Sequence, residues 1–121
     1  MRIGELAALV GTSTRALRYY EQQGLLTSTR DGNGYREYDE GALVRVRNIR
    51  ELLGVGLTTE DVLGYLEQGC LERPLSRTPR CTGEWETIRR RLESLDGRIS
   101  RLQETRDRLA RHGAEVEATA E

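Results

Sequence analysis

Lysine and phenylalanine are both missing from this sequence, and all 19 of its basic residues are arginine. Aromatic residues make up 5% of the chain and hydrophobic residues 36%, so we expect a modest, aliphatic core. The 121 residues suffice for one ordinary domain, or for one small domain with an appendage. The net charge of -1 argues against a surface that is basic all over. Residues 1–50 nevertheless carry eight arginines against six acidic residues, a net charge of +2, so the acidic surplus lies later in the chain.

Long hydrophobic runs are also absent. No run approaches the ~18 apolar residues that a membrane-spanning helix needs, and no charged-then-apolar leader precedes a cleavage site. We therefore expect a cytoplasmic protein that does not contact a membrane. In that compartment the two cysteines, Cys70 and Cys81, should be reduced unless they form a switch.

The residues that most catalytic sites need are scarce. The single histidine, His112, lies near the end of a predicted helix, where the helix dipole favours a solvated cation. There is no Ser-His-Asp set, no glycine-rich phosphate loop and no paired-carboxylate pattern. The sequence therefore predicts neither an enzyme nor a bound cofactor.

Two short predicted helices around Gly11 form a helix-turn-helix pattern. Residues 3–10 place apolar side chains at the spacing of one helix face. Ser13 is a good N-cap for the second helix, because its hydroxyl can accept a hydrogen bond from an unpaired amide. Gly24 can adopt the left-handed conformation that ends it. Any small helical hairpin would give a similar pattern.

The second of these helices has two unlike faces. Leu17 and Tyr20 are three residues apart and can face inward together. Arg15, Arg18 and Tyr19 are left on the opposite side. Cationic and phenolic groups on one face are suited to contact with phosphate.

A predicted hairpin follows, with strands in residues 27–30 and 35–38. Its turn, residues 31–34, is Asp-Gly-Asn-Gly, and both dipeptides favour hairpin turns. A hairpin directly after a helix-turn-helix is a wing. A plain surface hairpin would look the same, but Arg30 and Arg36 flank the tip and favour contact with DNA.

Asp39 is the expected N-cap of a third helix that runs to about Leu53. Its buried stripe is predicted to comprise Ala42, Val46, Ile49 and Leu53. Its three arginines are expected to form a solvated face rather than to contact bases: Arg45, Arg47 and Arg50.

Thr58 opens a fourth predicted helix, with Asp61 in a capping-box position, and Gly69 ends it. The apolar side of this helix comprises Val62, Tyr65 and Leu66. Residues 70–83 then read as a linker, because they contain both prolines of the chain.

Residues 84–112 show a heptad repeat over about four heptads. Positions a are Trp85, Leu92, Ile99 and Arg106, and positions d are Ile88, Leu95, Leu102 and Leu109. A helix of roughly 40 Å has no partner within so small a chain. We therefore predict a homodimer through this helix, with residues 113–121 as a flexible tail.

Several motifs fall in a fixed order: Arg18-Tyr19-Tyr20-Glu21, Gly24-Leu25-Leu26, Asn33-Gly34-Tyr35-Arg36-Glu37-Tyr38 and Ile49-Arg50-Glu51-Leu52-Leu53-Gly54. In this order and spacing, residues 1–69 closely resemble the DNA-binding domain of the MerR family of transcription regulators. The resulting fold prediction is mainly α: a winged helix-turn-helix domain followed by a long antiparallel coiled-coil dimerisation helix.

The resemblance implies a set of DNA-binding residues in the second helix and the wing: Ser13, Thr14, Arg15, Arg18, Tyr19, Tyr35 and Arg36. Arg18 and Tyr19 would mostly grip phosphate, and Arg15 would read a base edge. Tyr35 and Arg36 would contact backbone from the wing, whereas Tyr20 would belong to the core.

The family resemblance further implies a homodimer on an inverted-repeat operator in double-stranded promoter DNA. Such regulators bend and untwist DNA between promoter elements, so RNA polymerase is affected indirectly. A signal at the linker would set the spacing of the two DNA-binding domains. Two rival interpretations stay open: an architectural DNA binder without a sensor, and a coiled-coil adaptor that has lost DNA binding.

The sequence allows three interpretations of Cys70 and Cys81. They can be inert small residues beside a loop, a reversible disulfide acting as a redox sensor, or thiols pooled by the dimer for a soft metal. Metal sensors of the resembled family carry a further cysteine after the dimer helix, and iron–sulfur members need four clustered cysteines. Both features are absent, so we expect no metal site.

Overall fold

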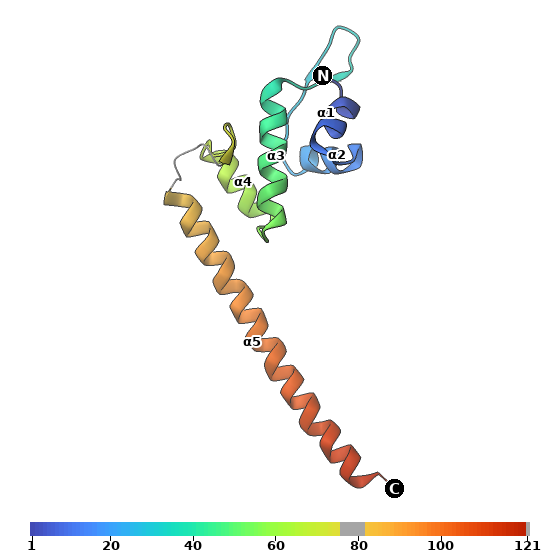
Figure 1. Ribbon diagram of the computed structural model, residues 1–121, viewed down its shortest axis with the longest axis vertical. Helices are drawn as coiled ribbons and strands as arrows, with labels where there is room; N and C mark the ends of the chain where they lie inside the picture. Colours follow the sequence, from blue (N-terminus) through green and yellow to red (C-terminus); the bar gives the residue numbers. More distant parts are fainter. Residues whose placement is uncertain (76–81, 121) are drawn as a thin grey trace. The chain divides into compact units, whose positions relative to one another are not determined.

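The computed structural model describes residues 1–75 and 82–120 (Figure 1). The elements in chain order are α1 (Ile3–Val10), α2 (Thr14–Gln22), β1 (Thr29–Arg30), β2 (Arg36–Glu37), α3 (Glu40–Gly54), α4 (Thr59–Glu67) and α5 (Thr82–Thr119). The fold is mostly helical with one small two-stranded wing, which confirms the predicted fold class. Residues 1–85 and 86–121 form two separate compact units.

The first unit is built around α3. This helix packs against α1 and α4, while α1 also packs against α2 (Figure 1). The core is mostly aliphatic, as expected from the composition, and also contains Tyr20, Tyr38 and Tyr65. Its largest fully buried side chains are Leu6, Leu17, Leu25, Val46, Ile49, Val62 and Leu71.

The predicted helix starts are confirmed by their capping hydrogen bonds. The Ser13 hydroxyl accepts from the Ala16 amide at 3.1 Å, and the Asp39 carboxylate accepts from the Ala42 amide at 2.8 Å. Thr58 makes both halves of a capping box with its partner at the third helical position. Each bond satisfies an amide that the helix itself leaves unpaired.

The buried side of α3 is broader than the predicted stripe. Leu52 is buried and Leu53 is half-buried, the reverse of the expectation at this end of the helix. Asn48, on the same flank as Leu52, is also buried. The physical reason is that α3 is covered by α1 on one side and by α4 on another, so burial spreads beyond one stripe.

Arg47 and Arg50 are exposed, as predicted, whereas Arg45 is half-buried. Arg45 forms ion pairs with Asp39 at 3.2 Å and with Glu72 at 3.3 Å. Arg50 donates through Nη1 to the Val10 carbonyl at the end of α1. The side chains of Arg45 and Arg50 are long enough to bind acceptors outside α3, so they connect this helix to neighbouring segments.

The predicted linker is partly integrated into the first unit. Cys70, Leu71 and Leu75 are buried, and the Asn48 amide nitrogen donates to the carbonyls of Leu71 and Arg73 at 2.9 and 2.8 Å. Residues 70–75 therefore pack against α3. Residues 76–81, which include Cys81 of the predicted linker, lie outside the described residues.

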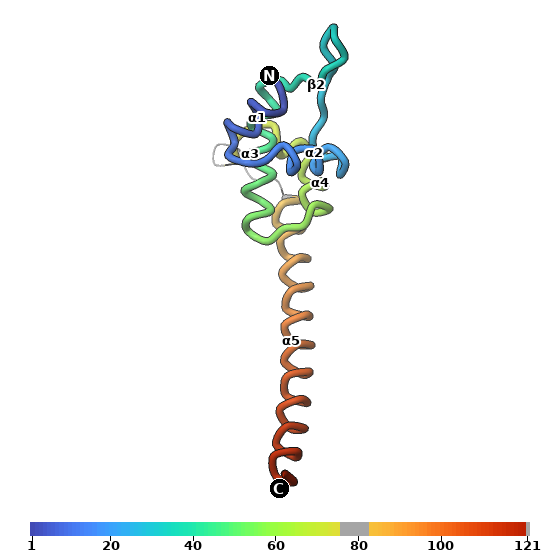
Figure 2. Tube along the Cα trace, turned by 90° about the vertical axis from the view of Figure 1, so that its right-hand side faces the viewer, coloured from blue at the N-terminus to red at the C-terminus, as the bar shows by residue number. Residues whose placement is uncertain are grey.

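The long helix predicted for residues 84–112 is present and extends further at both ends. Figure 2 shows α5 as one continuous helix. It continues through the predicted tail as far as Thr119, because the segment is rich in alanine and glutamate, which are strong helix formers. Among the described helices, none is both long and apolar enough to cross a membrane.

Candidate nucleic-acid interface

Helix α2 presents the two faces that the sequence predicts. Leu17 and Tyr20 are buried at 0% and 8% exposure. Arg15, Arg18 and Tyr19 are exposed on the other side. Both arginines stay charged at neutral pH, so this face can bind an anion.

The start of α2 adds further donors to this face. The Ser13 oxygen already accepts the Ala16 amide, but its own hydroxyl proton is available to a second acceptor. Thr14, the first residue of the helix, is half-buried beside it. Helix N-termini favour phosphate because their amides and the helix dipole both point toward it.

The wing follows α2 and extends away from the helices (Figure 2). Its strands are antiparallel, with Thr29 opposite Glu37 and Arg30 opposite Arg36. At the tip, Gly34 adopts φ 81°, the left-handed conformation that glycine favours.

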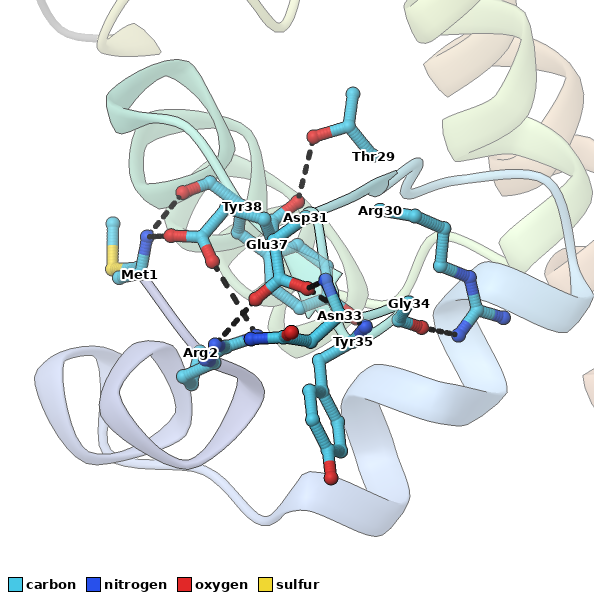
Figure 3. Close-up of polar contacts among 10 residues, drawn as sticks. All are labelled: Met1, Arg2, Thr29, Arg30, Asp31, Asn33, Gly34, Tyr35, Glu37 and Tyr38. Atoms are coloured by element: carbon cyan, nitrogen blue, oxygen red, sulfur yellow. Dashed lines mark hydrogen bonds and ion pairs between the residues drawn. The ribbon is translucent and has the colours of Figure 1, made fainter.

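Asp31 organises the tip of the wing (Figure 3). Its Oδ1 accepts from the amides of Asn33 and Tyr35 at 2.9 and 3.0 Å. Burial acts to raise the pKa of the Asp31 carboxyl, but these two bonds and the neighbouring Arg2 outweigh it and lower that pKa. The carboxylate therefore stays ionised and keeps the turn closed.

Glu21 joins the wing to helix α2. It forms an ion pair with Arg36 Nε at 3.2 Å, and its other oxygen accepts from the Tyr38 hydroxyl. Burial and the hydrogen bond to Glu21 raise the pKa of Tyr38 to about 12. Arg36, predicted as a DNA contact, thus has a structural bond as well, and its contact with DNA stays a prediction.

Arg2 lies beside this interface, although no motif of the sequence indicated it. The guanidinium of Arg2 lies 5.2 Å from the ring centroid of Tyr35, which is 64% exposed. Arg2 also forms ion pairs with Asp31 and Glu37 (Figure 3). The residue precedes the first helix and belongs to no periodic pattern, so only its charge opposite two wing carboxylates could have indicated the contact.

The structure thus brings the predicted residues of α2 and of the wing into one unit through Glu21. The residues predicted to sense a signal are Cys70 and Cys81. Cys70 is 3% exposed, and its Sγ lies 4.0 Å from the Gln68 carbonyl. Cys81 lies outside the described residues, so all three interpretations of the two cysteines stay open. Within residues 1–75 and 82–120, no group of three or more His, Cys, Asp and Glu side chains could hold a metal ion.

Comparison with known proteins fits this geometry. Residues 1–69 match the family model described as MerR HTH family regulatory protein. The chain is 32% identical over 109 residues to nodulation protein NolA of Bradyrhizobium sp. (strain NC92), an alignment that covers 89% of this chain and 41% of NolA. The chain therefore spans less than half the length of that relative.

A relative of similar length is the "Probable heavy metal-dependent transcriptional regulator" of Haemophilus influenzae. The two are 33% identical over 110 residues, which covers 88% of this chain and 86% of that protein. The fold also resembles HiNmlR, a MerR family regulator lacking the sensor domain, in its crystal structure bound to promoter DNA. That likeness has a TM-score of 0.59 at 19% identity and covers 88% of this chain and 78% of the other. This chain belongs to the MerR family of helix-turn-helix regulatory proteins.

Proposed function

We propose that this chain is a cytoplasmic, homodimeric transcription regulator that binds an inverted repeat in double-stranded promoter DNA and catalyses no reaction. The observation that carries the proposal is the exposed Arg15, Arg18 and Tyr19 face of α2, held beside the wing by Glu21. Membership of a family of regulators supports it.

Within this interface the side chains have different proposed roles. Arg15 would read a base edge in the major groove, where a bidentate contact with guanine is worth roughly 1–3 kcal/mol. Arg18 and Tyr19 would grip phosphate together with Ser13 and Thr14 at the helix start. Tyr35 and Arg36 would contact the backbone from the wing.

The proposed dimer is supported by apolar side chains that the single chain leaves exposed along α5. Leu92, Ile99, Leu102 and Leu109 are between 49% and 70% exposed. Their spacing continues a heptad seam, and such a seam is buried when a second copy packs against it. We propose an antiparallel pair of α5 helices, so that the two-fold symmetry of the dimer matches that of the operator.

The proposed mode of control is distortion of the DNA. Two domains at a fixed separation can bend and untwist the duplex between promoter elements, and RNA polymerase responds to the altered spacing. Bending a site of this size costs on the order of 1–6 kcal/mol, which extra phosphate contacts can offset.

The test is the affinity of the full chain for duplex fragments selected from its own genome. Replacing Arg18 with alanine should weaken binding roughly tenfold and reduce the slope of log K against log salt by about 0.9, because one phosphate contact is lost. Arg47→Ala is the matched control, since Arg47 is exposed on α3. Unaltered affinity in the Arg18 variant would favour the coiled-coil adaptor.

The proposed signal is a thiol or redox change at Cys70 and Cys81. Burial of Cys70 supports a slow response, because an oxidant reaches its sulfur only when residues 70–75 open. We expect operator binding or transcription to change on oxidation in wild type and not in Cys70→Ser. An identical response of both proteins to oxidant and reductant would remove the redox signal and favour the regulator without a sensor.

A further inference from the structure

The wing has little support of its own. Each of its strands is two residues long, and the ladder joins only Thr29 to Glu37 and Arg30 to Arg36. A two-stranded hairpin in isolation is at best marginally stable in water. Side chains outside the ladder must therefore fix its conformation.

Arg2 reaches the wing from the start of the chain and contacts both of its arms (Figure 3). One guanidinium nitrogen pairs with Asp31 after β1, and another lies 3.6 Å from Glu37 in β2. The same guanidinium lies over the ring of Tyr35. The backbone supports this attachment, because the Tyr38 amide donates to the Met1 carbonyl at 2.8 Å.

We propose that Arg2 is a positioning residue of the DNA interface, which holds the ring of Tyr35 in place by pairing with Asp31 and Glu37 and stacking on that ring. This inference rests on the proposed function, in which Tyr35 contacts the DNA backbone. In this proposal Arg2 does not bind phosphate, because its guanidinium is already engaged by two carboxylates, Asp31 and Glu37. Glu37 also pairs with the Met1 ammonium at 2.8 Å, so the charges of this cluster balance and leave little attraction for an anion. A cation over a tyrosine face restricts the ring without covering its hydroxyl.

The first test needs no DNA. In the full chain, Arg2→Gln should speed hydrogen exchange roughly tenfold at the amides of Tyr35 and Asn33, which donate hydrogen bonds to Asp31. Arg2→Lys should restore much of the protection, since lysine keeps the charge but not the planar fork. Arg47→Gln is the matched control and should leave both amides unchanged. Equal exchange in wild type and Arg2→Gln would overturn the proposal.

The second test is a double-mutant cycle on DNA affinity with Arg2→Gln and Tyr35→Ala. We expect each to weaken binding by roughly three- to tenfold, with little further loss in the double variant, because both remove the same contact. The salt slope of Arg2→Gln should equal that of wild type. Additive losses, or a slope reduced by about 0.9, would make Arg2 a phosphate contact and overturn the proposal.

The two tests separate this inference from the function on which it rests. A wild-type chain without affinity for any duplex would refute the proposed function. The exchange measurement would still decide whether Arg2 fixes the wing.

Discussion

At the scale of single residues, Glu21 is the connection on which the candidate interface depends. It lies on α2, where its carboxylate accepts a hydrogen bond from the Tyr38 hydroxyl and forms an ion pair with the Arg36 guanidinium. Tyr38 is 2% exposed, so its hydroxyl has little access to water. Loss of its proton would place a phenolate beside a carboxylate, and burial and this repulsion both oppose it.

The raised pKa of Tyr38 predicts how stability depends on pH. The unfolded chain loses this proton near pH 10, whereas the folded chain keeps it to about pH 12. Between these values the unfolded state binds fewer protons, so the free energy of unfolding falls as pH rises. From pH 9 to 11 we expect wild type to lose roughly 1 kcal/mol more than Tyr38→Phe, as measured by urea unfolding.

The comparison with Tyr38→Phe isolates this one group. Burial also raises the pKa of Tyr20, so both proteins should lose some stability in alkali. Parallel loss in the two proteins over this pH range would contradict the assigned role of Tyr38.

Residue types with strong local preferences were predictable from the sequence. Ser13, Asp39 and Thr58 cap helices as expected, because a cap bonds only within its own first turn. The partners of Arg2 and Arg50 were not predictable. Each contacts a segment at least 29 residues away, and no local pattern encodes such a pairing.

At the scale of elements, residues 70–75 of the predicted linker form a strap against α3, in which Cys70, Leu71 and Leu75 are buried. Asn48 is 3% exposed, and one amide group bonds two strap carbonyls, those of Leu71 and Arg73. Any movement of residues 70–75 must break these bonds. The sequence did not predict the strap, because a non-helical segment has no periodicity to distinguish a packed turn from an open one.

Removing the Asn48 side chain should destabilise the fold. Asn48→Ala removes the hydrogen-bond donor of two carbonyl groups, those of Leu71 and Arg73, and the first of these bonds is buried. We expect a loss of about 1–3 kcal/mol in the free energy of unfolding. Asn33→Ala is the control, because Asn33 is exposed at the wing tip and should change stability by no more than about 0.5 kcal/mol. Equal stability of the two variants in urea would show that the strap is not held by Asn48.

Element types were predicted well where the apolar spacing is regular, as in α1 and α5. The wing was predicted from its turn residues, but its strands are only two residues long. Ion pairs and the turn hydrogen bonds of Asp31 also stabilise the hairpin, beside this short ladder. Turn chemistry indicates where a hairpin lies and not how far its strands pair.

At the scale of the whole molecule, α5 is a helix without enough neighbours in one chain to bury its seam. Leu102 is 70% exposed, so a charge there costs nothing in a monomer. In the proposed dimer the same charge would be buried against the partner helix.

We therefore expect Leu102→Glu to weaken dimerisation roughly a hundredfold or more, measured by sedimentation equilibrium. Ser100→Glu is the matched control, because it adds the same charge two residues away, outside the heptad seam. A dimer equally stable in both variants would place the dimer contact elsewhere.

Binding of two chains to one operator can be tested by the mass of the complex between the full chain and one selected inverted-repeat duplex, measured by analytical ultracentrifugation. We expect two chains on each duplex, and at a protein concentration near the wild-type dissociation constant both Arg18→Ala and Leu102→Glu should leave only a small fraction of the duplex bound. A single chain on the duplex, or a complex that both variants form as well as wild type, would contradict this expectation.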